Sequence, residues 1–235
     1  MPMRTITLEE HFVTRDFLKA TVSDSADTPE YMQRLQAQLL DLGEGRIRAM
    51  DEGGVDLQIL SLAAIGVDSL SPADQTSVLR GVHDELASAI QAYPDRLKVF
   101  CTPALKEPAN AVRELERTVK IPGFVGMMID GTIDGKFLDA PEFFPILEAA
   151  ESLDVPVYIH PAPPPEPVKT AYYSGLLATP AIFFQSPAGA GTRKPPSTSS
   201  GSFSPAFSTN CQSCKSSSAT WAKVSHMRLH APMAY

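Results

Sequence analysis

The chain has 235 residues, of which 43% are hydrophobic and 20% charged, with three cysteines and a formal net charge of −7. This composition excludes wholesale disorder, and three cysteines over this length exclude a disulfide framework. No apolar run reaches the ~20 residues of a membrane span, and residues 1–12 lack the apolar stretch of a signal peptide. We therefore expect a cytoplasmic protein with no membrane partner.

The charge is divided unevenly along the chain. Residues 1–166 hold all 27 acidic residues and 14 of the 20 basic ones, hence a net charge of −13. Residues 167–235 hold six basic residues and no acidic one, although globular segments have about 25% charged residues on average. Together with the pattern of elements described below, this predicts an N-terminal domain over residues 1–181 and a separate tail over residues 182–235.

Short apolar runs alternate with amphipathic segments through the N-terminal domain. Strands are predicted at 5–11, 55–63, 97–104, 124–130 and 155–160. Helices are predicted at 29–50, interrupted at Gly43 and Gly45, and at 74–93, 108–118 and 141–152. Nearly continuous apolar strands between helices predict an α/β protein with a parallel sheet. Both a doubly wound sheet and a (β/α)₈ barrel fit, although no GxGxxG follows the first strand.

Polar residues stand where the first and fifth predicted strands end. Glu9 and His11 are two residues apart on one strand, so their side chains are expected on the same face. His160 ends the fifth strand, and in a closed barrel these two strand ends face each other at the catalytic side. One carboxylate and two imidazoles suit Zn²⁺ or a similar divalent ion. Taken singly, each residue also fits an ordinary strand-end or core position.

Three further residues have both a functional and an ordinary interpretation. Asp130 ends the fourth strand and is a candidate substrate-binding residue, or else a turn residue before Gly131. His83 lies within a predicted helix and is expected to be a surface or packing group. Cys101 lies within the third strand and is expected to be a small buried hydrophobe.

Four segments resemble the amidohydrolase-related metal-dependent decarboxylases, which include gamma-resorcylate, 2,3-dihydroxybenzoate and aminocarboxymuconate-semialdehyde decarboxylases. The segments are TLEEHF (7–12), VDLQILSL (55–62), GFVGMMIDG (123–131) and LDVPVYIHP (153–161). The resemblance runs from about residue 5 to about residue 180. It implies an incomplete (β/α)₈ barrel of about five βα units, in which Glu9, His11 and His160 match metal ligands. The family metal is Zn²⁺ or Mn²⁺, according to the member.

The resemblance also implies a reaction, namely non-oxidative decarboxylation of an aromatic or muconate-type carboxylic acid without an organic cofactor. The family metal holds the carboxylate and a neighbouring oxygen of this small-molecule substrate. Further family ligands are a His after the sixth strand and an Asp after the eighth. A lactonase-like, metal-dependent hydrolase on the same barrel is the alternative enzyme. Full-length members are often dimers or tetramers, so a homo-oligomer is expected of them rather than of this shorter chain.

The tail does not continue the βα pattern. Residues 186–235 hold 12 Ser, no Asp or Glu and no sustained apolar strand, which predicts a disordered, low-complexity coil. Four of its residues come close to zinc-finger spacing, namely Cys211, Cys214, His226 and His230. However, the spacer is one residue short, and Ser218 stands where a finger has an aromatic. A non-catalytic zinc-binding module is therefore the alternative from another class, and the acidic domain disfavours nucleic acid as a partner.

A shifted reading frame accounts for the same tail. Serine codons of the TCN type, read one base back, become NTC codons for Phe, Leu, Ile or Val. Residues 188–226, read in this way, permit an amphipathic helix, a strand and a GHMGEG turn that resemble the family's next units. We therefore predict a frameshift that begins near residues 181–187. We also expect the 235-residue chain to be prone to aggregation and to have little or no activity.

Overall fold

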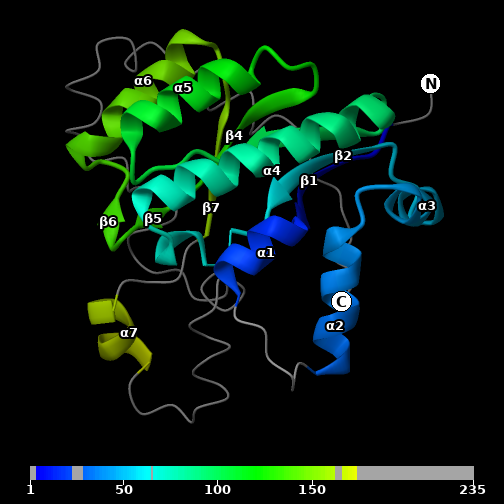
Figure 1. Ribbon diagram of the computed structural model, residues 1–235, viewed down its shortest axis with the longest axis horizontal. Helices are drawn as coiled ribbons and strands as arrows, with labels where there is room; N and C mark the ends of the chain where they lie inside the picture. Colours follow the sequence, from blue (N-terminus) through cyan, green and yellow to red (C-terminus); the bar gives the residue numbers. More distant parts are fainter. Residues whose placement is uncertain (1–3, 23–28, 65, 162–165, 174–235) are drawn as a thin grey trace.

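A single curved parallel sheet forms the centre of the molecule (Figure 1). The computed structural model describes residues 4–22, 29–64, 66–161 and 166–173. The sheet has the order β1-β2-β3-β4-β7. Its strands are β1 (Ile6–Phe12), β2 (Leu57–Leu62), β3 (Leu97–Cys101), β4 (Phe124–Asp130) and β7 (Val157–His160). Because every neighbouring pair is parallel, all five carboxyl ends lie at one edge.

Helices connect the strands, and α4, α5 and α6 cover one face of the sheet (Figure 1). The helices are α1 (Arg15–Thr21), α2 (Glu30–Leu40), α3 (Glu44–Glu52), α4 (Pro72–Ala92), α5 (Pro108–Thr118), α6 (Phe144–Ser152) and α7 (Glu166–Tyr173). Two 3₁₀ turns, η1 (Val67–Ser69) and η2 (Pro141–Phe143), and a hairpin of β5 (Thr132–Ile133) and β6 (Lys136–Phe137) complete the described elements. This βα alternation is the barrel-type architecture that the sequence predicts.

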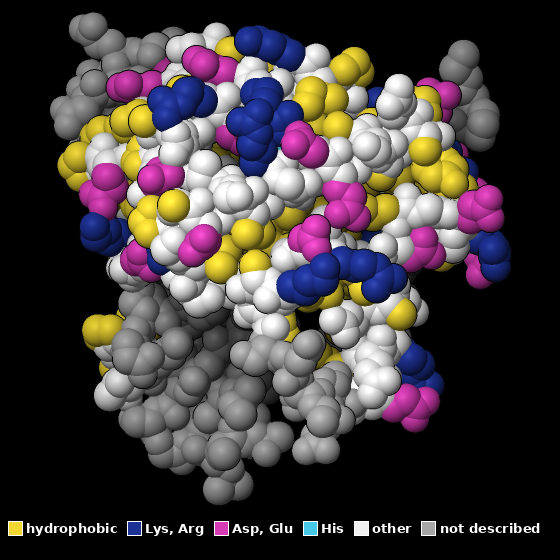
Figure 2. All heavy atoms as spheres, in the orientation of Figure 1, with side chains coloured by type: hydrophobic (Ala, Val, Ile, Leu, Met, Phe, Trp, Pro, Cys, Tyr) yellow, Lys and Arg dark blue, Asp and Glu magenta, His cyan; other side chains and the backbone are white. Residues whose placement is uncertain are grey.

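The two faces of the sheet carry two separate apolar clusters. Alternate residues of β2 divide between them, since Leu60 belongs to the large cluster under the helices and Ile59 to the small one. The small cluster consists of Leu57, Ile59, Phe100 and Met128, against which Ile6, Leu8 and Tyr158 pack. We call the face that carries it the inner face. Over the helical face, acidic and basic side chains are interspersed, and among its described residues no histidine is visible (Figure 2).

Most predicted elements are present, with local differences that have physical reasons. The 29–50 segment divides into α2 and α3 at the predicted interruption, where the Asp41 carboxylate accepts from the Gly43 amide at 2.9 Å. Ser71 caps α4, since its hydroxyl accepts from the Asp74 amide. The short helix α1 and the β5–β6 hairpin escaped prediction, because seven and two residues are too few for a periodic pattern.

His83 is buried between α4, α5 and the end of β3, so the surface alternative for this residue is wrong. Its Nδ1 lies 2.8 Å from Glu114 Oε1, and its Nε2 accepts from the Thr102 amide at 3.1 Å. The imidazole therefore ties both helices to the strand. Cys101 is buried, as expected.

The predictions for the tail lie outside the described residues. They are the boundary at residue 181, the disordered coil, the frameshift and the finger-like set Cys211, Cys214, His226 and His230. Among the described residues, no strand pairs with the outer side of β1 or β7. None of the described helices has the length and apolarity that a membrane crossing requires.

Stability should depend on burial at the centre of the sheet. Leu60 is fully buried, so Leu60→Ala should lower the free energy of unfolding by about 2–5 kcal/mol, because it leaves a cavity. Leu35 on α2 is 44% exposed, so Leu35→Ala should change the free energy of unfolding by less than about 0.5 kcal/mol. Urea titration followed by circular dichroism measures both. Equal losses for the two variants would contradict the described core.

Candidate metal centre

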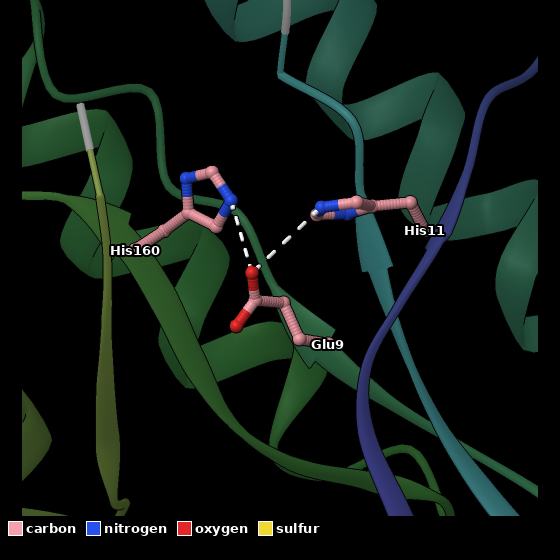
Figure 3. A group of neighbouring side chains, drawn as sticks. All are labelled: Glu9, His11 and His160. Carbon is pink, nitrogen blue, oxygen red and sulfur yellow. Dashed lines mark ion pairs between the residues drawn. The ribbon is translucent and has the colours of Figure 1, made fainter. Parts of the chain in front are cut away.

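Three side chains predicted as metal ligands meet across the open side of the curved sheet. Glu9 and His11 extend from β1 and His160 from the end of β7, and Figure 3 shows them pointing toward one another. One ligand atom from each lies within 4.8 Å of the other two. Oε1 of Glu9 is 3.3 Å from Nε2 of His160 and 4.0 Å from Nε2 of His11. The sheet's curvature therefore brings its two edge strands together at the carboxyl end.

A bulge in β1 places Glu9 on the inner face. Thr7 pairs with Gln58 and Glu10 with Leu60, so β1 has one residue more than β2 over this stretch. Glu9 itself has a left-handed backbone, with φ of 65°, which costs a non-glycine residue about 1–2 kcal/mol. Strict alternation from Ile6 and Leu8, which pack on the inner face, would send Glu9 and His11 to the helical face. The bulge reverses the alternation and is thus required for the site.

The side chains next to the histidines fix the direction of both rings. Oδ1 of Asp130 lies 3.1 Å from Nδ1 of His160, and Oγ of Ser61 lies 3.1 Å from Nδ1 of His11. Each ring therefore uses Nδ1 for its neighbour and turns Nε2 toward Glu9. A hydrogen-bond partner on the far nitrogen is the usual arrangement for a metal-binding histidine.

Arg46 of α3 holds β1 from the helical side. Its guanidinium donates to the carbonyl oxygen of His11 at 2.9 Å and to Oε1 of Gln58 at 3.2 Å. Gln58 in turn donates to Glu10 at 3.3 Å, so Glu10 lies on the helical face while Glu9 lies on the inner one. Sequence reasoning missed Arg46, because its partners are backbone and cross-strand groups that no local pattern reveals.

The charges of the three groups are strongly coupled. Hydrogen bonds to Asp130 and Glu9 raise the pKa of His160 to about 9, and the hydrogen bond with His160 lowers the pKa of Glu9. Burial lowers the pKa of His11, and the charge of His160 lowers it further. The contacts of His160 with Glu9 and Asp130 therefore favour its protonated form, with the ring between two carboxylates.

The arrangement fits a divalent metal ion. Glu9, His11 and His160 offer one carboxylate oxygen and two imidazole nitrogens, a set that suits Mn²⁺ or Zn²⁺. The positive charge that the site already stabilises at His160 is one that a cation could supply instead. Asp130, besides orienting His160, lines a small cavity with Thr102 and Met128. That Asp130 binds the substrate stays a prediction.

Tyr158 is a neighbour of the site that sequence reasoning missed. It lies on β7, and its hydroxyl donates to Oε2 of Glu9. The spacing Tyr-x-His within one strand was an available signal, because residues two apart share a face. Its apolar surroundings make it look like an ordinary core residue in the sequence.

A curved parallel βα sheet with a carboxylate and two histidines at the carboxyl ends of its strands is typical of barrel enzymes that use a metal ion. The family model for amidohydrolases matches residues 28–200. The chain belongs to the amidohydrolase family.

Several relatives that it resembles are decarboxylases. The chain is 37% identical to the gamma-resorcylate decarboxylase of Polaromonas sp. (strain JS666), over 68% of this chain and 50% of the relative. A structure of 5-carboxyvanillate decarboxylase from Novosphingobium aromaticivorans, with manganese and 4-hydroxy-3-methoxy-5-nitrobenzoic acid, is 32% identical with a TM-score of 0.65. It covers 70% of this chain and 52% of that one.

A third relative completes the comparison. The dihydroxybenzoic acid decarboxylase of Polaromonas sp. JS666, with manganese and 2-nitroresorcinol, is 30% identical with a TM-score of 0.65, over 79% of this chain and 56% of that one. The chain thus spans about half the length of the relatives that it matches.

The pKa of His160 should report its hydrogen bond with Asp130. In metal-free protein we expect a His160 pKa near 9, and Asp130→Asn should move it toward 6.5, because the largest cause of the increase is removed. Asp134→Asn, the same change in the following turn, should leave it unaltered. NMR titration of the imidazole signals, with a chelator present, measures these values.

The same pKa sets a stability window. The folded-state pKa of His160 lies above the ordinary value of 6.5. The contribution of His160 to the free energy of unfolding is therefore fully present below about pH 6.5 and is lost as the pH rises through about 9. Unfolding curves of metal-free protein at several pH values test this. An Asp130→Asn variant with an unchanged pH profile would contradict the pairing.

Proposed function

We propose that this chain carries the metal-binding portion of a non-oxidative decarboxylase of aromatic or muconate-type carboxylic acids. The proposal rests on one observation, the convergence of Glu9, His11 and His160 at the carboxyl edge of an amidohydrolase sheet (Figure 3). The decarboxylase names of the relatives support this chemistry over hydrolysis. In this proposal the substrate partner is a small-molecule carboxylic acid, and the location is the cytoplasm.

The three ligand side chains and their neighbours have distinct roles in this proposal. When bound, the divalent ion supplies positive charge that holds the substrate's oxygens and stabilises the charge that develops on them. Glu9, His11 and His160 would hold the ion, and Asp130 orients His160. A carboxylate repels another carboxylate, so Asp130 would accept a hydrogen bond from a ring hydroxyl of the substrate rather than contact its carboxyl group.

Manganese is the metal that we propose first. The residue types alone suggest Zn²⁺, with Mn²⁺ as the other choice, and a site with one oxygen and two nitrogens suits either ion. Three of the similar solved structures contain manganese. That observation favours Mn²⁺ for this chain, with Zn²⁺ as the competitor to be compared in the same titration.

Metal binding should distinguish two adjacent carboxylates. We expect about one Mn²⁺ per chain, and Glu9→Gln should weaken the affinity by at least ~10-fold, because an amide replaces a charged ligand. Glu10→Gln should bind as the wild type does, since Glu10 lies on the helical face with Gln58. Electron paramagnetic resonance of free Mn²⁺ measures the affinities. Equal weakening by both variants would count against the ligand assignment.

Binding and turnover should separate in this chain. We expect 2,6-dihydroxybenzoate to bind only when Mn²⁺ is present, as measured by the change in the Mn²⁺ resonance spectrum. Release of CO₂ should be slow or undetectable. The family's further ligands follow the sixth and eighth strands, and residues 186–235 show no βα pattern that would supply such strands. Hydrolysis of a lactone panel without any binding of hydroxybenzoates would favour the hydrolase instead.

A further inference from the structure

The carboxylate of Glu9 is divided between two tasks. Its Oε1 faces the two imidazoles, at 3.3 Å from His160 and 4.0 Å from His11. Its Oε2 accepts a hydrogen bond from the hydroxyl of Tyr158. Tyr158 lies two residues before His160 on β7, so both side chains project from the inner face. One strand thus supplies a candidate ligand and a group that contacts another candidate ligand.

Glu9 needs such a partner more than an ordinary strand residue would. It lies in the β1 bulge with a left-handed backbone, so regular strand pairing does not set its direction. Its side chain is about one-third exposed, and packing alone therefore leaves the carboxylate free to rotate. A hydrogen bond on Oε2 removes that rotation and leaves Oε1 aimed at the site.

The ring of Tyr158 is itself held by Phe100. The two rings stack, with centroids 5.6 Å apart and planes 22° from parallel. Phe100 is buried on β3 and Tyr158 lies on β7, and β4 runs between these strands. The Phe100 ring must therefore lie across the inner face of β4 to reach its partner.

Gly126 of β4 leaves the space for this crossing. A Cβ atom at this position would lie 2.8 Å from Cε1 of Phe100 and 3.0 Å from the carbonyl oxygen of Pro156. Any larger residue would push the ring away from Tyr158 or displace the backbone at Pro156, just before β7. Phe100, whose ring occupies the space left at Gly126, stacks on Tyr158, and the Tyr158 hydroxyl donates to Glu9. These contacts link β3 to β1.

We propose that Tyr158 is a positioning residue that fixes Glu9 for metal binding, with Phe100 and Gly126 fixing Tyr158 in turn. This inference rests on the proposed function, since it takes Glu9 as a metal ligand. It assigns no catalytic step to Tyr158, which acts through Glu9.

The first test is Tyr158→Phe, which keeps the stacked ring and removes only the hydroxyl. We expect 10- to 100-fold weaker Mn²⁺ binding, the usual effect of removing a partner of a metal ligand. The unfolding midpoint of metal-free protein should stay near that of the wild type, a result that separates positioning from folding. Tyr93→Phe, a tyrosine that packs in the large cluster under the helices, is the matched control and should bind Mn²⁺ normally.

The outcomes separate this inference from the proposed function. Unchanged Mn²⁺ affinity in Tyr158→Phe, with weakened affinity in Glu9→Gln, would overturn the positioning role and leave the ligand assignment intact. Unchanged affinity in both variants would remove Glu9 as a ligand, and the inference with it. Weakened affinity in both, with Tyr93→Phe unaltered, supports the positioning role.

A double-mutant cycle tests the link to Gly126. Gly126→Ala should weaken Mn²⁺ binding, but only slightly further when Tyr158→Phe is already present, because both changes act through one hydrogen bond. Full additivity of the two effects would overturn the role of Gly126. The unfolding midpoint of each metal-free variant shows that the comparison is made between folded proteins.

Discussion

A single extra residue in β1 determines where the chemistry of this protein can lie. The parallel register brings five carboxyl ends to one edge, but alternation alone would turn Glu9 and His11 toward the helices. The bulge reverses that alternation after Leu8, at the cost of a left-handed backbone at Glu9. Such strain persists only where the surroundings fix it, and here Arg46 holds the end of β1 while Tyr158 holds the side chain.

The electrostatics of the site follow from the same geometry. Two carboxylates, Glu9 and Asp130, lie on opposite sides of the His160 ring and stabilise its protonated form. A cation that binds Nε2 must first displace this proton, so metal binding and proton release are linked. Because Asp130 contacts Nδ1, the proton on Nε2 can leave without breaking that hydrogen bond.

Much of the fold and the candidate site could be predicted from the sequence, for identifiable reasons. The strand containing Leu60 is a nearly continuous apolar run, and the helix that begins at Pro108 is long enough for its apolar period to show. The positions of Glu9, His11 and His160 at strand ends were visible for the same reason. The predictions failed where the cause is non-local. The bulge depends on pairing with β2, and the burial of His83 depends on Glu114 and Thr102 in other elements.

Metal binding and turnover need not share the same elements. The three candidate ligands come from the two edge strands of the described sheet. Their neighbours Asp130, Ser61 and Tyr158 come from β4, β2 and β7, respectively. The relatives are about twice as long as the matched segment, so groups that act on the substrate can lie on units beyond these five. On the proposed function, the five N-terminal units hold the metal ion that binds the substrate's carboxylate. The reaction then also depends on side chains from the remaining units. The division is physically reasonable, because each ligand is fixed by neighbours within the same five strands.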